Sequence, residues 1–283
     1  MLIGAHVSTA GGLPRVVERA EELECDAIQI FNQSPRMWRP TRYEQEDFDS
    51  FREAFGPSRL QSVVIHMIYL VNPATSDREL RRKSLGSLTH ALRVGEGIGA
   101  DGVVIHPGAL KGDTRARAKQ RAVKLLTEAL AETESCPMLL ENTAGSPALL
   151  GLGFEELGEL IDKCGGGERL GLCIDSCHLH AYGYDVRSRE GVTELVDELD
   201  SEVGLERLRC LHLNDSKDER GSNRDRHENI GRGQIGRDGF RAFLGEPRFG
   251  DLPALLETPG PDGHGPDRRQ IRATKKLLAE AAR

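Results

Sequence analysis

Short apolar runs alternate with longer amphipathic stretches along the whole chain. Each apolar run is four or five residues long, which is the length of a strand rather than a helix. Each is followed by a stretch in which apolar residues recur every three to four positions, the period of a helix with one buried face. The predicted strands are Leu2–His6, Ala27–Phe31, Ser62–His66, Gly102–His106, Met138–Glu141, Gly171–Asp175, Arg209–His212 and Ala254–Glu257.

Eight strand–helix units within 283 residues predict an α/β protein, a (β/α)₈ TIM barrel in which residues 1–283 form a single domain. Successive strand ends lie about 25–45 residues apart, which leaves room for one βα unit each. An open doubly wound sheet is the alternative, but no Gly-x-Gly-x-x-Gly motif follows the first strand. In the third unit, Ser76-Asp77-Arg78-Glu79 matches a capping box and predicts a helix that extends to Gly97.

Composition narrows the class of protein. Hydrophobic residues make up 38% of the chain and charged residues 29%, which fits a domain with a sizeable core and a hydrated surface. The apolar runs are far shorter than the ~20 residues needed to span a bilayer. The N-terminus lacks a basic region followed by an apolar stretch, and the six cysteines include no Cys-x-x-Cys pair. We therefore expect a cytoplasmic protein with reduced thiols and no membrane partner.

Ligand-type residues stand at the ends of the third to eighth predicted strands. The C-terminal ends of the strands surround one mouth in a (β/α)₈ barrel, and the active site lies there. Three carboxylates at one mouth repel one another unless cations are present. Imidazole and carboxylate together are ligands that zinc accepts, so the pattern predicts a metal site. The strand-end residues are His66, His106, Glu141, Asp175, His212 and Glu257.

Two loops add further ligand-type residues. His178 follows Asp175 by three positions, and Asp225 and His227 lie in the long segment after the seventh strand. The resulting nine side chains are too many for one tetrahedral zinc. Two or three metals that share a bridging carboxylate are therefore expected. Metals about 3.5–4 Å apart clamp a phosphodiester and stabilise both its attacking and its leaving oxygen.

Short segments around these residues form a recognisable set. The segments are Gly4-Ala5-His6-Val7-Ser8, His66-x-x-Tyr69-Leu70, Val104-Ile105-His106-Pro107-Gly108, Leu140-Glu141-Asn142-Thr143-Ala144-Gly145, Ile174-Asp175-Ser176-Cys177-His178, Leu211-His212-Leu213-Asn214-Asp215-Ser216-Lys217, Asp225-Arg226-His227 and Leu256-Glu257-Thr258-Pro259. Together they resemble the endonuclease IV family, the zinc-dependent apurinic/apyrimidinic endonucleases of DNA base-excision repair. The resemblance runs from residue 4 to about residue 269.

The resemblance implies a trinuclear zinc site, although Mn or Fe could fill some positions. It implies that His66, His106 and Glu141 hold the first zinc, with Glu141 bridging to the second. Asp175, His212 and Glu257 complete the second position, and His178, Asp225 and His227 hold the third. The expected reaction is hydrolysis of the phosphodiester 5′ to an abasic site, leaving a 3′-hydroxyl and a 5′-deoxyribose phosphate. Glu141 or Glu257 is expected to orient the attacking hydroxide, and the sequence does not separate the two.

The expected partner is double-stranded DNA that contains an abasic site, bound by a monomer. The resemblance implies that Arg36 contacts DNA and that Tyr69 and Leu70 insert into the duplex, as wedge side chains do. For Trp38, packing within the protein is as good an explanation as DNA contact. The formal net charge is −7, and three zincs would bring it to −7 + 6 = −1. The DNA-binding face can then be positive while the outer helices stay acidic.

Two other functions fit parts of the pattern. A metal-dependent sugar isomerase or epimerase uses the same kind of barrel, but it needs fewer ligands and leaves His178, Asp225 and His227 unexplained. A protein that recognises abasic DNA without cutting it has no need for a complete ligand set. The remaining histidines, among them His264, are interpreted as structural. For His6, which ends the first predicted strand, a structural role is preferred over support of the metal ligands from outside the ligand set.

Overall fold

The computed structural model describes residues 1–282 of the chain. Within this range, eight parallel strands close into a barrel in the order β1-β10-β7-β6-β5-β4-β3-β2. The predicted (β/α)₈ barrel is thereby confirmed. The barrel strands are β1 (Leu2–His6), β2 (Ala27–Phe31), β3 (Ser62–His66), β4 (Gly102–Ile105), β5 (Met138–Glu141), β6 (Leu170–Asp175), β7 (Leu208–Leu213) and β10 (Pro253–Leu256).

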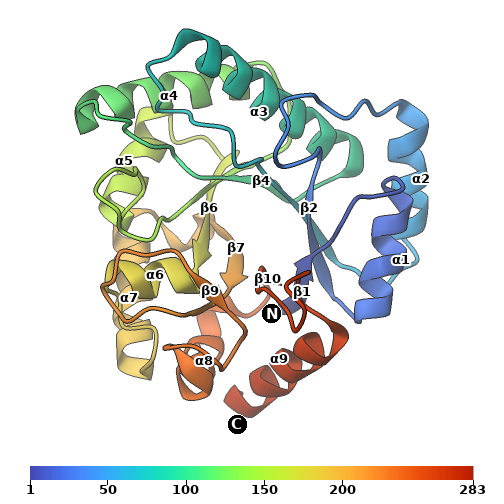
Figure 1. The fold of residues 1–283 in the computed structure, drawn as a ribbon, viewed down its shortest axis with the longest axis vertical. Coiled ribbons are helices and arrows are strands. Elements are labelled where there is room, and N and C mark those ends of the chain that lie inside the picture. Colours follow the sequence, from blue (N-terminus) through green and yellow to red (C-terminus); the bar gives the residue numbers. More distant parts are fainter. Residues whose placement is uncertain (283) are drawn as a thin grey trace.

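The helices form a ring around the outside of the strands (Figure 1). In that view α3 and α4 lie at the top, α1 and α2 on the right, and α8 and α9 at the bottom. The helices are α1 (Pro14–Leu23), α2 (Gln45–Phe55), α3 (Arg78–Ile98), α4 (Arg115–Ala131), α5 (Phe154–Lys163), α6 (Ser176–Tyr182), α7 (Arg189–Glu202), α8 (Gly236–Leu244) and α9 (Arg268–Ala281). No helix within residues 1–282 is long and apolar enough to cross a membrane.

The start of α3 differs by one residue from the capping box expected from the sequence. Asp77, rather than Ser76, is the N-cap residue, because its carboxylate accepts a hydrogen bond from the backbone N–H of Leu80 at 2.7 Å. The helix continues to Ile98, and Gly99 ends it in the left-handed conformation with φ of 71°. The predicted helix was right, and its first residue was wrong.

Two strands end one residue earlier than predicted. β4 ends at Ile105 and β10 ends at Leu256, so His106 and Glu257 are the first residues beyond their strands. Both still follow the alternation of the strand before them, in which residues two positions apart face the same side.

Inside the barrel, this alternation produces two sets of side chains. The core set is an apolar cluster at the centre of the barrel, made of Ala27, Val64, Val104, Leu139, Cys173, Cys210 and Leu255. The mouth set consists of the residues two positions further along the same strands, Gln29, His66, His106, Glu141, Asp175, His212 and Glu257. In β1, Leu2 packs against the core set, and Gly4 has no side chain because a Cβ there would lie 1.8 Å from the carbonyl oxygen of Ala27.

The pairing of β6 with β7 contains a register shift. Leu172 pairs with Leu208, but the next residue, Cys173, pairs with Cys210, so β7 carries one extra residue, Arg209. A shift of one residue exchanges the two faces of a strand. The shift therefore determines that Cys210, like Cys173, faces the barrel interior, with His212 two positions further on.

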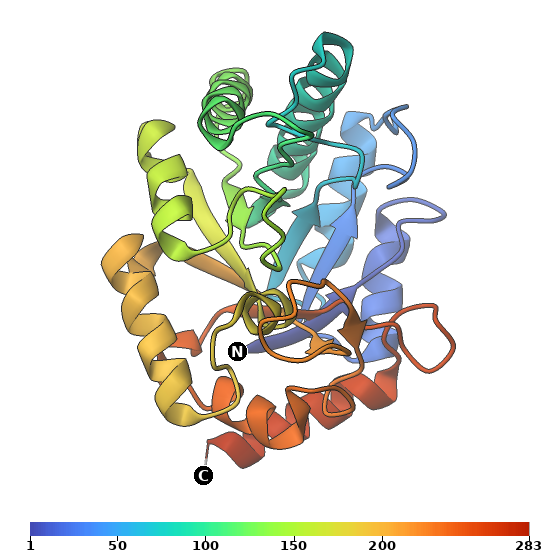
Figure 2. The same cartoon turned by 60° about the vertical axis from the view of Figure 1, so that its left-hand side comes forward.

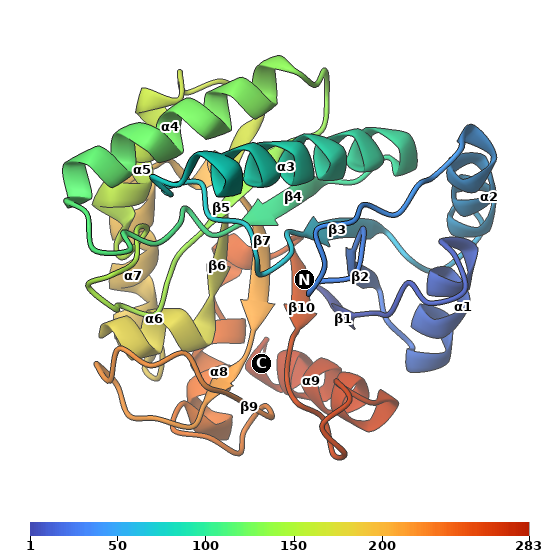
Figure 3. The same cartoon turned by 45° about the horizontal axis from the view of Figure 1, so that its top comes forward.

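The segment after β7 forms the largest loop over the mouth. It contains a short antiparallel pair, β8 (Asp215–Ser216) and β9 (His227–Glu228), which the sequence did not predict. β8 contacts α6, the short helix that begins directly after β6. Figures 2 and 3 show this loop, in orange, beside α6.

Candidate metal centre

The nine side chains predicted as metal ligands meet at the C-terminal mouth of the barrel. They form three groups, within each of which the ligand atoms lie within 4.8 Å of one another. The groups are His66, His106 and Glu141; Glu141, Asp175, His212 and Glu257; and His178, Asp225 and His227. Glu141 belongs to the first two groups, which is the bridging position expected for it. The structure thus brings all nine residues together, and their role as metal ligands stays a prediction.

Glu141 lies at the centre of the arrangement, and only 1% of its side chain is exposed. Its Oε2 lies 2.8 Å from Nε2 of His106 and 3.3 Å from Nε2 of His66. Its Oε1 lies 2.9 Å from Nδ1 of His212. The same oxygen lies 3.5 Å from Nδ1 of His178, so one carboxylate faces four imidazoles from all three groups.

The third group stands between the barrel and the loop that follows β7. Asp225 Oδ2 lies 3.2 Å from His178 Nε2, and Asp225 Oδ1 lies 3.0 Å from His227 Nε2. Asp175 Oδ2, which belongs to the second group, lies 3.6 Å from the same nitrogen of His227. Half of the Asp225 side chain is exposed, whereas that of His178 is buried. This group is therefore the most open of the three.

The opposed charges of the cluster shift its pKa values. Burial opposes charge on His227, but the neighbouring carboxylates Asp175 and Asp225 outweigh it and raise its pKa to about 9. At Glu257, burial is likewise outweighed by the positive charge of His212 and His66, and the pKa falls to about 2. Without metal, protonated imidazoles balance the carboxylates, and cations would take the place of these protons.

Three amide side chains hold the ligand-type residues in place. Asn214 donates to Asp175 Oδ2 at 2.6 Å, and its Oδ1 accepts the backbone N–H of Glu257 at 3.0 Å. Gln29 donates to Glu257 Oε1 at 2.5 Å. Asn142 Oδ1 accepts the backbone N–H of Asp175 at 2.7 Å. The sequence analysis missed these roles. The available signal was a polar residue within or directly after an apolar strand.

The orientation of the imidazoles fits metal binding. His66 donates from Nδ1 to the carbonyl oxygen of Met67 at 2.7 Å, which leaves Nε2 facing Glu141. His178 donates from Nδ1 to the carbonyl oxygen of Asn142 at 2.9 Å, and its Nε2 faces Asp225. Metal-binding histidines characteristically use one ring nitrogen in this way and keep the other for the metal.

The remaining imidazoles support the same conclusion. His212 donates from Nε2 to Gln29 Oε1 at 2.8 Å, so Nδ1 faces the carboxylates. His227 Nε2 is buried and has no hydrogen-bond partner within residues 1–282, although Asp225 Oδ1 is only 3.0 Å away. Nitrogen and oxygen atoms that converge without forming hydrogen bonds fit cations placed between them. The residues present therefore fit a metal cofactor.

The cluster opens into a cavity of about 940 Å³. Its wall includes members of all three groups, together with His6, Ser8, Gln33, Thr258 and His264. The sequence analysis interpreted His6 and His264 as structural, but both line the cavity. His6 is held by the side chain of Gln29, 3.1 Å from its Nδ1, and burial lowers its pKa to about 4.

Comparison with known proteins agrees with this geometry. The family model described as "Xylose isomerase-like TIM barrel" matches residues 17–281. The chain is 40% identical over 261 residues to "Probable endonuclease 4" of Methanoculleus marisnigri, which covers 92% of this chain and 93% of the relative. The crystal structure of endonuclease IV from Thermus thermophilus is 39% identical, covers 99% of this chain and 100% of that one, and superposes with a TM-score of 0.85.

This chain belongs to the endonuclease IV family. The family is confirmed as the sequence predicted it. A D-tagatose 3-epimerase-like protein also superposes, with a TM-score of 0.74 over 99% of this chain, but at 20% identity this likeness shows the shared barrel alone.

The side chains expected to contact DNA differ in how much of each is exposed to solvent. Tyr69 follows β3 and is 70% exposed, with its ring edge against Phe31 at a centroid distance of 5.4 Å. Arg36 is exposed in the loop after β2. Leu70 and Trp38 are half-buried and pack against the hydrophobic core. Tyr69 and Arg36 are therefore available at the mouth of this endonuclease IV family member, and most of Leu70 is not.

Proposed function

We propose that the chain is an apurinic/apyrimidinic endonuclease that cuts DNA 5′ to an abasic site with three zinc ions. Membership of the endonuclease IV family makes it a nuclease with a metal cofactor and a DNA substrate. The observation that carries the finer proposal is the division of nine ligand-type residues into three groups at one open cavity. A sugar isomerase would leave the third group, His178, Asp225 and His227, without a role. The monomeric state and the cytoplasmic location remain predictions.

When bound, the zinc ions would lower the pKa of water and neutralise charge on the phosphodiester. The three groups would hold these ions as the sequence predicted, with Glu141 shared between the first and second. The protein contributes the fixed positions, because the carboxylates and imidazoles are already held by Asn142, Asn214 and Gln29. We propose that the products are a 3′-hydroxyl and a 5′-deoxyribose phosphate.

Glu257 is the better candidate for orienting the attacking water. Glu141 is 1% exposed, and both of its oxygens face imidazoles. The Glu257 side chain is 18% exposed, and its Oε2 lies 3.4 Å from His212 Nδ1. Its other oxygen accepts the amide of Gln29, which fixes the carboxylate plane. Glu257 can therefore take up a proton at Oε2 while it stays in position.

DNA binding is proposed for the rim of the cavity. Tyr69 projects above the first group, with its ring 6.4 Å from that of His66, where it could fill the gap left by a missing base. Arg36 supplies a positive charge beside it and lies close enough to influence the pKa of Tyr69. Insertion of Leu70 remains a prediction that would require this half-buried side chain to leave the core.

Cleavage of a duplex with one tetrahydrofuran abasic analogue tests the proposal. Elemental analysis of the purified protein should find close to three zinc ions per chain. A chelator should abolish cleavage, and added zinc should restore it. His106→Ala should lose metal and activity together, whereas His90→Ala, on the outer helix α3, should keep both. One metal or none in active protein, or full cleavage after metal removal, would contradict the zinc mechanism.

A further inference from the structure

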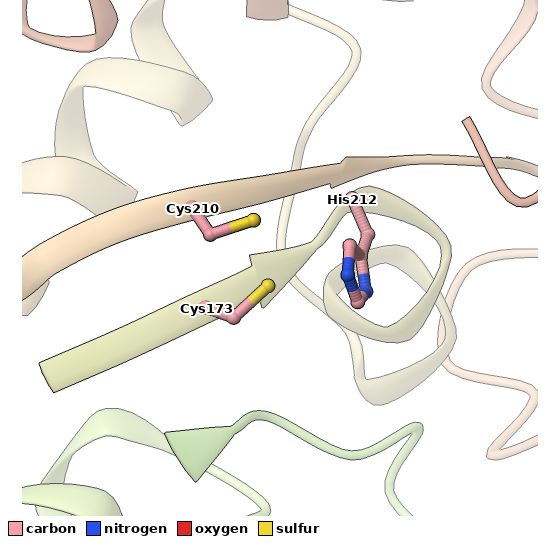
Figure 4. A group of neighbouring side chains, drawn as sticks. All are labelled: Cys173, Cys210 and His212. Atoms are coloured by element: carbon pink, nitrogen blue, oxygen red, sulfur yellow. The ribbon is translucent and has the colours of Figure 1, made fainter. Parts of the chain in front are cut away.

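A second group of metal-type ligands lies beneath the mouth set. Cys173 and Cys210 stand on neighbouring strands and pair directly in the register of β6 and β7. Both are fully buried, and the ligand atoms of Cys173, Cys210 and His212 lie within 4.8 Å of one another. Figure 4 shows the two sulfur atoms side by side, on the side of the strands that faces His212. None of the functions described above uses these thiols.

We infer that Cys173, Cys210 and His212 form a binding site for a soft, thiol-seeking divalent cation, and that its occupation disables the second metal position. Thiolate ligands select soft metals, whereas carboxylate and carbonyl oxygens select hard ones such as Mg²⁺. The core set around the two cysteines is apolar, and it offers no carboxylate. Among residues 1–282, the one imidazole within reach of both sulfurs is that of His212, which the second group also needs.

The charge of the site favours a divalent ion. Binding would displace one proton from each thiol to the solvent and form two sulfur–metal bonds. Two thiolates and a divalent cation sum to zero charge, which an apolar surrounding tolerates far better than an isolated ion. The Cys210 thiol already contacts the two other members of the site, Cys173 and His212, and its Sγ lies 3.8 Å from the carbonyl oxygen of Leu211. A bound cation would therefore mainly replace contacts within the site itself.

The consequence for cleavage comes from the double use of His212. Both of its nitrogens already have partners, Nδ1 facing Glu141 at 2.9 Å and Nε2 facing Gln29 at 2.8 Å. A metal held by the two sulfurs that also takes a nitrogen of His212 must break one of these contacts. The second group contains no other imidazole. A cation on Nδ1 would take the only nitrogen ligand of the second group, and a cation on Nε2 would break the contact with Gln29 that holds the ring in place. This step rests on the proposed function, whereas binding of the cation to the thiols does not.

Cadmium is the probe, and it is added to the full-length, metal-loaded protein. The absorption of cadmium–thiolate bonds in the ultraviolet should appear with two thiolates per bound ion. It should be lost in Cys210→Ser and in Cys173→Ala. Cys177→Ala is the matched control. Cys177 is also a buried thiol, and together with Asp175 and His227 it forms a separate group that could bind cadmium without Cys173 and Cys210. A signal that disappears in Cys177→Ala, or that persists in Cys210→Ser, would overturn the site. Thermal melting verifies that each variant is folded.

Cleavage of the abasic duplex is measured in the same titration, with each variant normalised to its own rate without cadmium. Cadmium should lower the rate of the parent at least ~10-fold, the loss typical of a disturbed ligand shell. Cys210→Ser should be inhibited far less. Cadmium–thiolate absorption without any loss of cleavage would overturn the coupling to His212. A parent that fails to cut before cadmium is added would instead refute the proposed function and leave the binding result intact.

Discussion

The mouth set and the core set come from the same seven strands and lie only two residues apart, yet they hold opposite kinds of side chain. The mouth set contains three imidazoles, three carboxylates and one amide, whereas the core set is aliphatic apart from two cysteines. Strand alternation sends both sets into the barrel interior. In a barrel of this kind, one inward-facing residue of each strand can stabilise the fold and the next inward-facing residue can take part in the reaction. Substitutions in the two sets should therefore affect stability and cleavage separately.

The largest effect is expected at Glu257 in the mouth set. Glu257→Gln keeps the size and one oxygen but removes the charge and the ability to accept a proton, so cleavage should fall at least ~10²-fold. DNA affinity should change far less, because the proposed DNA contacts lie at the rim. Single-turnover cleavage beside equilibrium binding measures both.

Glu246→Gln is the matched control for this substitution. Glu246 is also a buried carboxylate, but it pairs with Arg248 away from the mouth. The control should lose stability and keep its cleavage rate. If Glu257→Gln cuts within a few-fold of the parent, the assignment of Glu257 is wrong.

The next effect concerns the hydrogen bonds that hold the mouth set in place. It tests whether their loss weakens metal binding. Asn214→Ala removes the hydrogen bonds to Asp175 and to the backbone of Glu257. Loss of such a partner typically costs about 10–100-fold in metal affinity. Zinc competition with a chelator should show this loss, and excess zinc should recover most of the cleavage. Unchanged zinc affinity would mean that Asn214 only packs.

A smaller effect is expected just above the mouth set, at Tyr69. Tyr69→Ala should reduce the preference for abasic over intact duplex at least ~5-fold, since an aromatic contact to a base contributes about 1–3 kcal/mol. Folding should be unaffected because the side chain is 70% exposed. Tyr182→Ala, another exposed tyrosine, serves as the control. Equal preference in the Tyr69 variant and the parent would remove the wedge role.

The smallest effect on cleavage is expected in the core set. Leu139→Ala should cost about 2–5 kcal/mol in the free energy of unfolding, the usual range for a buried leucine. The folded fraction should still cut within a few-fold of the parent, because Leu139 is two residues from the nearest ligand-type residue, Glu141. Urea unfolding and cleavage by the folded protein are compared. A loss of cleavage as large as that of Glu257→Gln would show that packing and chemistry are not separable.

Much of this arrangement could be predicted because it follows from local patterns. A strand that ends on His66 or Glu141 is visible as an apolar run followed by a ligand-type residue, and the barrel collects such ends at one mouth. The supporting residues were missed because their roles depend on partners far along the chain. Gln29 interrupts an apolar strand, and nothing local shows that it reaches both His212 and Glu257.

The register shift between β6 and β7 is a second feature that the sequence does not reveal. The sequence of β7 does not show which of its two faces points into the barrel. The pairing with β6 determines that Cys210 faces the interior. The position of His264 was missed for a similar reason. Its Gly- and Pro-rich segment has no periodic pattern, so its place in the cavity wall depends on how the loop folds back.

Asp215 sets the third group apart from the other two. Its buried carboxylate accepts the backbone N–H groups of Gly231, Gly233 and Ile235 at 2.9 Å each, and so closes the loop that carries Asp225 and His227. Strands and the residues directly after them supply every member of the first two groups. The third group depends in addition on this loop of some twenty residues. Its geometry therefore relies on a carboxylate outside the ligand set, and it is also the group most open to solvent.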